Sequence, residues 1–125
     1  MITYDKFQLE NGLKVIVHKD TSTLVAAMNI LYDVGARDEH PDKTGFAHLF
    51  EHLMFGGSVN IPNYDSPLQM AGGENNAFTT NDITNYYITL PVNNLETAFW
   101  LESDRMLSLA FSEKSLEVQR NVVIE

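Results

Sequence analysis

The order of the expected elements constrains the fold most, because strands and helices come in separate groups along the chain. Apolar runs and apolar–polar alternation predict strands over residues 7–10, 13–18, 24–32, 76–79 and 83–90. Helical patterns cover residues 45–55, 93–109 and 112–125, with one further turn at 67–71. This grouping favours an α+β fold, a mostly antiparallel sheet with helices packed on one face.

Some of these elements carry more specific expectations. The dipeptide Asn11-Gly12 suits a type I′ turn, so the first two strands form a hairpin. Residues 24–32 are apolar almost throughout, which predicts an interior strand. In the helix at 93–109, Asn93 and Glu96 have the spacing of a capping box. The apolar sides of the last strand and of this helix are expected at Tyr86, Ile88 and Leu90, and at Leu95, Ala98, Phe99 and Met106.

Composition narrows the class of function. The chain has 125 residues, so residues 1–125 are expected to form a single domain. Its net charge of −9 argues against a nucleic-acid partner, and the absence of cysteine excludes disulfides and thiol catalysis. No apolar stretch is long enough to span a membrane, and the first residues show no secretory leader. The compartment stays open between cytoplasm, periplasm and organelle.

The segment from His48 to His52 points to chemistry. At about 100° per residue, His48, Glu51 and His52 gather on one side of a helix, which we expect to face a cleft. Histidines four residues apart can bind one metal ion, and Glu51 is placed to take a proton from a metal-activated water. Four apolar side chains fall on the opposite side and are expected to pack against the sheet. These are Phe46, Leu49, Phe50 and Leu53.

Longer blocks around this segment carry a resemblance. His-x-x-Glu-His is the inverted zincin motif. It lies within residues 44–57, which follow a related block at 34–39, and further blocks stand at 73–79 with 85–87 and at 119–125. Together they resemble the pitrilysin family of metallopeptidases, peptidase family M16, over nearly the whole chain and in the same order. The resemblance implies the N-terminal part of a catalytic half domain, which is incomplete here.

The family pattern implies a role for each matched position. His48 and His52 would be ligands of Zn²⁺, and Glu51 would be the catalytic general base.

A second block implies the substrate site. Asn76, Ala77 and Phe78 match an edge strand on which an extended peptide substrate is laid. Asn76 would also help to position or polarise the scissile carbonyl.

The third zinc ligand of the family is a Glu that ends a Val-Val-x-x-Glu run. Here Val122 and Val123 put that ligand one position beyond Glu125, and Glu125 itself is one position early. Gln119 stands where the family has a supporting Glu. Two imidazoles without a third ligand hold zinc weakly.

The sequence therefore predicts a zinc-dependent endopeptidase whose present 125-residue portion is inactive, or nearly so, alone. The family also implies a second homologous half, in the same chain or a partner chain. Apolar surface left uncovered by missing parts predicts self-association.

Other functions compete with this interpretation. The chain could be a non-catalytic partner half or a scaffold module of the same family, although such halves usually lose the ligand residues that are present here. S-ribosylhomocysteine lyase carries a similar motif, but its chemistry needs a cysteine, and this chain has none.

Overall fold

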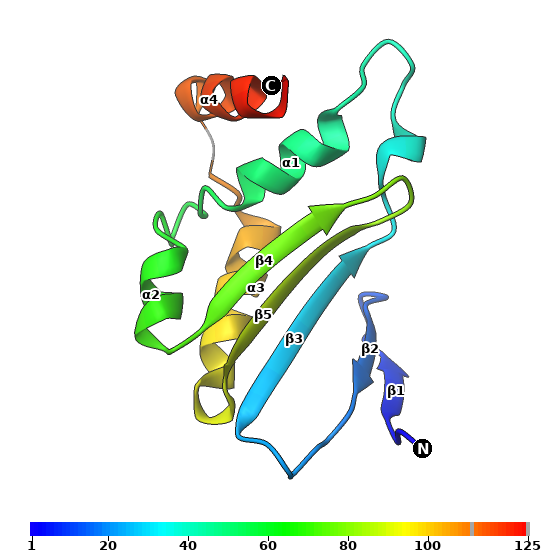
Figure 1. The fold of residues 1–125 in the computed structure, drawn as a ribbon, viewed down its shortest axis with the longest axis vertical. Helices are drawn as coiled ribbons and strands as arrows, with labels where there is room; N and C mark the ends of the chain where they lie inside the picture. The colour runs from blue at the N-terminus through cyan, green and yellow to red at the C-terminus, as the bar shows by residue number, and fades with distance from the viewer. Residues whose placement is uncertain (111, 125) are drawn as a thin grey trace.

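The computed structural model describes residues 1–110 and 112–124 and shows a three-stranded antiparallel sheet packed against helices, with a separate two-stranded sheet beside it (Figure 1). The strands are β1 (Asp5–Gln8), β2 (Lys14–Val17), β3 (Val25–Tyr32), β4 (Glu74–Thr79) and β5 (Thr84–Pro91). The α-helices are α1 (Phe46–Met54), α2 (Asp65–Met70), α3 (Leu95–Leu107) and α4 (Glu113–Ile124). Short 3₁₀ turns lie at η1 (Ala36–Asp38) and η2 (Val92–Asn94). The predicted α+β class is confirmed.

The main sheet has the order β3-β5-β4, with both pairs antiparallel. Within the described residues β5 is the central strand and β3 lies at an edge, so the prediction of an interior strand over residues 24–32 is wrong. The continuous apolar run does not indicate an interior strand here, because only every second side chain of β3 turns toward the helices. The others, such as Val25 and Leu31, stay exposed on the far face.

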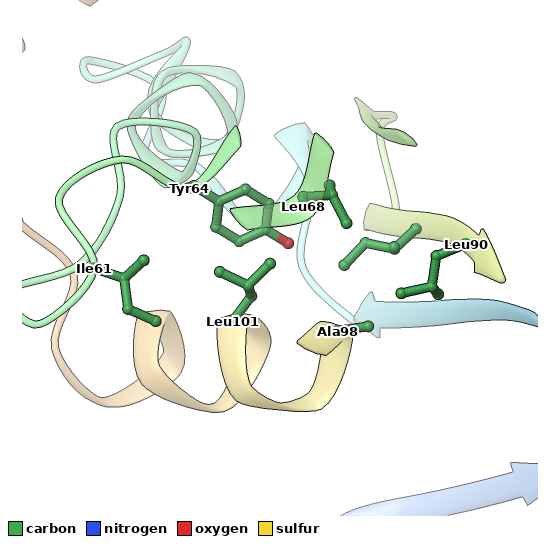
Figure 2. Packing of buried hydrophobic residues seen from close by; sticks show 7 residues of the cluster. Ile61, Tyr64, Leu68, Leu90, Ala98 and Leu101 are labelled. Atoms are coloured by element: carbon green, nitrogen blue, oxygen red, sulfur yellow. The ribbon is translucent and has the colours of Figure 1, made fainter. Parts of the chain in front are cut away.

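The core lies between the sheet and the helices, which cover one face of it (Figure 2). As predicted, the alternation of β5 buries Tyr86, Ile88 and Leu90 on one side. Leu101 of α3 is fully buried and packs into the same cluster. The cluster consists of Ile61, Tyr64, Leu68, Ile88, Leu90, Ala98 and Leu101.

The buried stripe of α3 differs from the predicted one. Phe99 and Met106 are exposed, whereas Leu101 and the charged pair Glu102 and Arg105 are buried. The stripe is shifted because α3 packs through Ala98 and Leu101 onto the core cluster, and the charged pair continues the same helix face.

The start of α3 also differs from expectation. The turn η2 precedes the helix, which moves the cap to Asn94, and no side-chain capping bond forms. The capping box at Asn93 and Glu96 is therefore wrong. Asn94 instead donates through Nδ2 to the carbonyl of Ala71, 2.9 Å away.

The first two strands form the predicted hairpin, which pairs as a separate two-stranded sheet. Its turn is not of type I′, because that type needs positive φ at both central residues, and only Gly12 has it, at +91°. The Gly12 N–H donates to the carbonyl of Leu9 at 2.9 Å, and Leu9 N–H donates to the carbonyl of Leu13. None of the described helices is long and apolar enough to span a bilayer.

A buried polar cluster, the Arg105 cluster, connects α3 to α1. It consists of Arg105, Glu102, Tyr64 and Tyr86. Arg105 pairs with Glu102 at 2.6 and 2.9 Å, and its guanidinium lies 4.6 Å from the ring centroids of both Tyr64 and Tyr86. Tyr64 donates its hydroxyl to Glu102 as well. Arg105 also donates to the carbonyl of Met54, at the last residue of α1, over 3.3 Å. The cluster therefore fixes the C-terminal end of α1.

Candidate metal centre

Helix α1 carries the predicted site, and its N-terminus is held from outside the helix. Gly45 precedes the helix with φ +88°, a backbone conformation that glycine adopts without strain. The N–H groups of Gly45 and Ala47 donate to the two carboxylate oxygens of Glu39, each over 2.7 Å. An anion at this end is favourable for the helix dipole. Sequence reasoning missed this role of Glu39, because the spacing is longer than a capping box.

The two histidines of the motif face each other. Nε2 of His48 and Nε2 of His52 are 3.1 Å apart, with ring centroids separated by 4.7 Å. Two imidazole nitrogens bound to one tetrahedral zinc ion at the usual bond length lie about 3.3 Å apart. The spacing of the two nitrogens therefore suits a shared zinc ion.

The second ring nitrogen of His52 is held by helix α4. Nδ1 lies 3.2 Å from Oε1 of Gln119, an amide oxygen that can only accept. Nδ1 must then carry the proton, which leaves the lone pair of Nε2 directed toward His48. Neutral nitrogens can share this short distance only if His48 donates or a cation lies between them. A second bond that fixes the ring in this way is a common feature of zinc-binding histidines.

Glu51 lies next to the histidines but does not face open solvent. Its residue is 8% exposed, and Oε2 accepts a hydrogen bond of 2.5 Å from the hydroxyl of Thr79, at the end of β4. The predicted cleft-facing position is thus met only in part, because the residue is mostly covered and only Oε1 has no partner among the described residues. The physical reason is that α1 packs against β4, which brings the Glu51 side of the helix onto the strand. Sequence reasoning did not single out Thr79.

The opposite side of α1 also departs from prediction. Leu53 is buried as expected and Leu49 is half-buried, whereas Phe46 and Phe50 are 48% and 49% exposed. The two phenylalanines line a cavity of about 660 Å³ between α1, β3, β5 and α3. Met54, Tyr32 and Leu109 are among its other walls. The described residues do not fill this space, so the apolar side of α1 is only partly covered.

The strand matched to the substrate site lies at the free edge of the main sheet. β4 pairs with β5 alone among the described strands, which leaves one edge open. Asn76 and Phe78 are exposed, and Ala77 is half-buried, with alternation along the strand. The N–H of Ala77 donates to Oδ1 of the neighbouring Asn76 at 2.8 Å. The structure thus places these residues beside the site, with their edge partly capped by Asn76.

Tyrosines beneath the site keep their protons. Burial raises the pKa of Tyr86 far above its ordinary value, and Arg105 opposes the shift only in part. Burial likewise raises the pKa of Tyr32. Neither phenol therefore supplies a negative charge near α1.

Most of the sequence matches the model of a known protein family. The model described as insulinase, peptidase family M16, matches residues 14–125. The chain belongs to peptidase family M16.

Relatives within this family include named zinc proteases. The chain is 36% identical to the zinc protease PqqE of Helicobacter pylori, over 98% of this chain and 28% of that protein. It is 28% identical to a probable mitochondrial-processing peptidase subunit beta of Arabidopsis thaliana, over 93% of this chain and 22% of that protein. The chain thus spans less than a third of the length of these relatives.

Solved structures agree in fold. A protease from Helicobacter pylori superposes with a TM-score of 0.91 at 34% identity, over 98% of this chain and 30% of that one. Pitrilysin superposes with a TM-score of 0.86 at 26% identity, over 97% of this chain and 13% of that one.

Zinc fits this M16 chain as a two-histidine half-site. The facing nitrogens and the Gln119 bond suit the ion, but among residues 1–110 and 112–124 no group of three or more His, Cys, Asp or Glu side chains converges on one point. The predicted third ligand follows Glu125, and both positions lie outside the described residues. The half-site therefore differs from a complete zinc centre because it has two protein ligands instead of three or four.

Proposed function

We propose that this chain is the part of a zinc-dependent endopeptidase that carries two zinc ligands and the general base. One observation carries the proposal: Nε2 of His48 and Nε2 of His52 face each other at 3.1 Å, while Gln119 holds the other nitrogen of His52. Membership of peptidase family M16 and relatives named zinc proteases support it. A scaffold needs no such pairing of ring nitrogens.

The residues of the chain take distinct roles in this proposal. His48 and His52 hold the ion, which when bound supplies Lewis acidity for the scissile carbonyl and the attacking water. Glu51 accepts a proton from that water as its oxygen attacks the carbonyl carbon. The same carboxyl then gives the proton to the amide nitrogen as the carbon–nitrogen bond breaks. The carboxylate is restored at the end of the cycle.

The substrate in this proposal is a peptide in extended form. It adds as a strand to the free edge of β4, where Asn76, Ala77 and Phe78 supply main-chain groups. Because Asn76 Oδ1 occupies the N–H of Ala77, the incoming peptide has to displace this side chain. The freed Asn76 amide can then donate to a substrate carbonyl. The net charge of −9 favours basic peptides through long-range attraction.

The complete enzyme in this proposal needs more than the described residues. Residues 1–125 would form one domain, the N-terminal part of an M16 catalytic domain, with the third ligand just after Glu125 and a second homologous half opposite. Residues 1–125 alone are then inactive or nearly so, and self-associate through the exposed apolar side of α1. Zinc-dependent cleavage of an internally quenched peptide by residues 1–125 alone would contradict this.

The test of the function compares three forms of the full-length protein with the same peptide. We expect zinc-dependent cleavage by the wild type, and loss of cleavage in both His48→Ala and Glu51→Gln. Only His48→Ala should also lose zinc, because Glu51 is not a ligand. A wild type that binds zinc without cleaving any of a library of peptides would contradict the proposal.

A second function has two observations in its favour. Gln119, in place of the family's supporting Glu, and the absence of a three-ligand cluster among the described residues favour a non-catalytic partner half or scaffold module. The zinc content of the wild type against His48→Ala separates the two functions. Equal and negligible zinc in both would support the non-catalytic alternative.

A further inference from the structure

The hydrogen bond between Thr79 and Glu51 links two parts of the site that the sequence treats separately. Glu51 comes from α1, and Thr79 ends β4, the strand proposed to hold the peptide. The two residues are 28 positions apart in the sequence. Their bond of 2.5 Å is the only one that joins the Glu51 carboxylate to another side chain among the described residues.

Thr79 is itself rigidly placed. It lies opposite Thr84 in the β4–β5 ladder, and the hydroxyl of Thr84 donates to the carbonyl of Val34 over 3.0 Å. The turn that follows is closed by a bond of 2.8 Å from Thr80 N–H to the carbonyl of Ile83. The Thr79 hydroxyl is therefore presented by a fixed strand end, not by a free loop.

Because of this bond, the two carboxylate oxygens of Glu51 differ in what they can accept. Oε2 is occupied by the Thr79 hydroxyl, and Oε1 has no hydrogen-bond partner within the described residues. A general base works best when its accepting oxygen is held in one place, because a rotating carboxylate spends part of its time in unproductive orientations. A donor on one oxygen restricts that rotation and leaves the other oxygen for the proton.

We propose that Thr79 is a positioning residue for Glu51: its hydroxyl holds Oε2, so that Oε1 accepts the proton from the attacking water. Thr79 also ties the base to the strand that carries the peptide, so base and scissile bond keep a constant separation. The inference rests on the proposed peptidase function and adds to it a residue that touches neither substrate nor ion.

The experiment uses the full-length protein, an internally quenched peptide and three variants. Thr79→Val removes the hydroxyl at nearly constant shape, and Thr79→Ser keeps it. Thr89→Val makes the same change at an exposed position of β5 and serves as the matched control. For each variant we measure kcat, KM, bound zinc and the urea midpoint of unfolding.

We expect Thr79→Val to lower kcat by about 10- to 100-fold with KM within about twofold of the wild type, because binding of the peptide does not need the base. Thr79→Ser should restore kcat to within about threefold, and bound zinc should stay unchanged in both. Thr89→Val should behave as the wild type.

Other results overturn the inference. These are an unchanged kcat in Thr79→Val, an equal loss in Thr79→Ser, or a loss that appears in KM or in bound zinc. If Thr79→Val does not fold, Thr79→Ala replaces it, and failure of both to fold shows a purely structural role. A wild type without peptidase activity is a different outcome, because it contradicts the proposed function itself.

Discussion

Two polar clusters flank helix α1, and they differ in how far the chain satisfies them. In the Arg105 cluster, both oxygens of Glu102 accept bonds from Arg105, and Tyr64 donates to the same carboxylate. Within the described residues no fully buried side-chain nitrogen or oxygen lacks a partner. This cluster needs nothing from outside the chain.

The histidine side of α1 is built in another way. His48 and His52 turn ring nitrogens toward each other, and the bond from His52 to Gln119 leaves a lone pair in the gap. Oε1 of Glu51 also keeps free acceptor capacity. Polar residues with a purely structural role thus bond to one another, whereas those proposed here for catalysis leave acceptors for a ligand.

The largest effect on stability is expected from a substitution in the Arg105 cluster. Arg105→Met should lower the free energy of unfolding by about 3–5 kcal/mol, because it leaves Glu102 buried and uncompensated. Urea denaturation followed by circular dichroism measures this. Arg37→Met is the control, since Arg37 is exposed and solvent screens its ion pairs with Asp33 and Asp82. Equal losses in the two variants would mean that the Arg105 cluster is not special.

The second prediction concerns Glu51, on the histidine side of α1. Glu51→Gln in the full-length protein should lower kcat by about 10²- to 10⁴-fold, because an amide cannot accept the proton. Bound zinc should not change. Steady-state cleavage of a quenched peptide and metal analysis measure both quantities. Glu113→Gln, at an exposed position of α4, is the control and should leave kcat unaltered. Retained activity in Glu51→Gln would remove Glu51 from the mechanism.

The third prediction concerns the bond that orients His52. Gln119→Leu should weaken zinc binding by about 10- to 100-fold, the usual cost of losing an outer partner of a zinc-binding histidine. Competition with a chromogenic chelator measures the affinity. Gln69→Leu makes the same change on the exposed side of α2 and should have no effect. Unchanged affinity in Gln119→Leu would show that the ring needs no such support.

The smallest effect lies at Asp104, next to the Arg105 cluster. Hydrogen bonds from Ser58 and then from Asn60 lower the pKa of Asp104 below its ordinary value of 3.8. Its stabilising contribution is therefore complete above pH 3.8 and disappears as the pH falls through the lowered pKa. The wild type should be more stable than Asp104→Asn near neutral pH, and the difference should shrink in acid. Urea midpoints across a pH series test this, and a difference that grows in acid contradicts it.

Local periodicity was enough to predict how several side chains are arranged. The helical period put His48, Glu51 and His52 on one side of α1, and the strand period put Tyr86, Ile88 and Leu90 in the core. Both rules depend only on neighbouring residues, and both patterns are present in the structure.

Contacts between distant segments could not be predicted in this way. The burial of Glu51 depends on Thr79, and the exposure of Phe50 depends on what packs against α1, which no local pattern records. Similarly, the apolar run of β3 does not reveal how many strands lie beside it. The pair formed by Glu102 and Arg105 is a local contact by contrast, since the two residues lie three positions apart on the same helix.

His48 and His52 are proposed to bind one zinc ion together. Metal analysis of the full-length protein tests it directly, with His40→Ala as control because His40 is exposed and pairs with Asp42 instead of either histidine. We predict about one zinc per chain in the wild type and in His40→Ala, and under about a tenth of that in His48→Ala and in His52→Ala. One zinc per chain in all four proteins would contradict the claim.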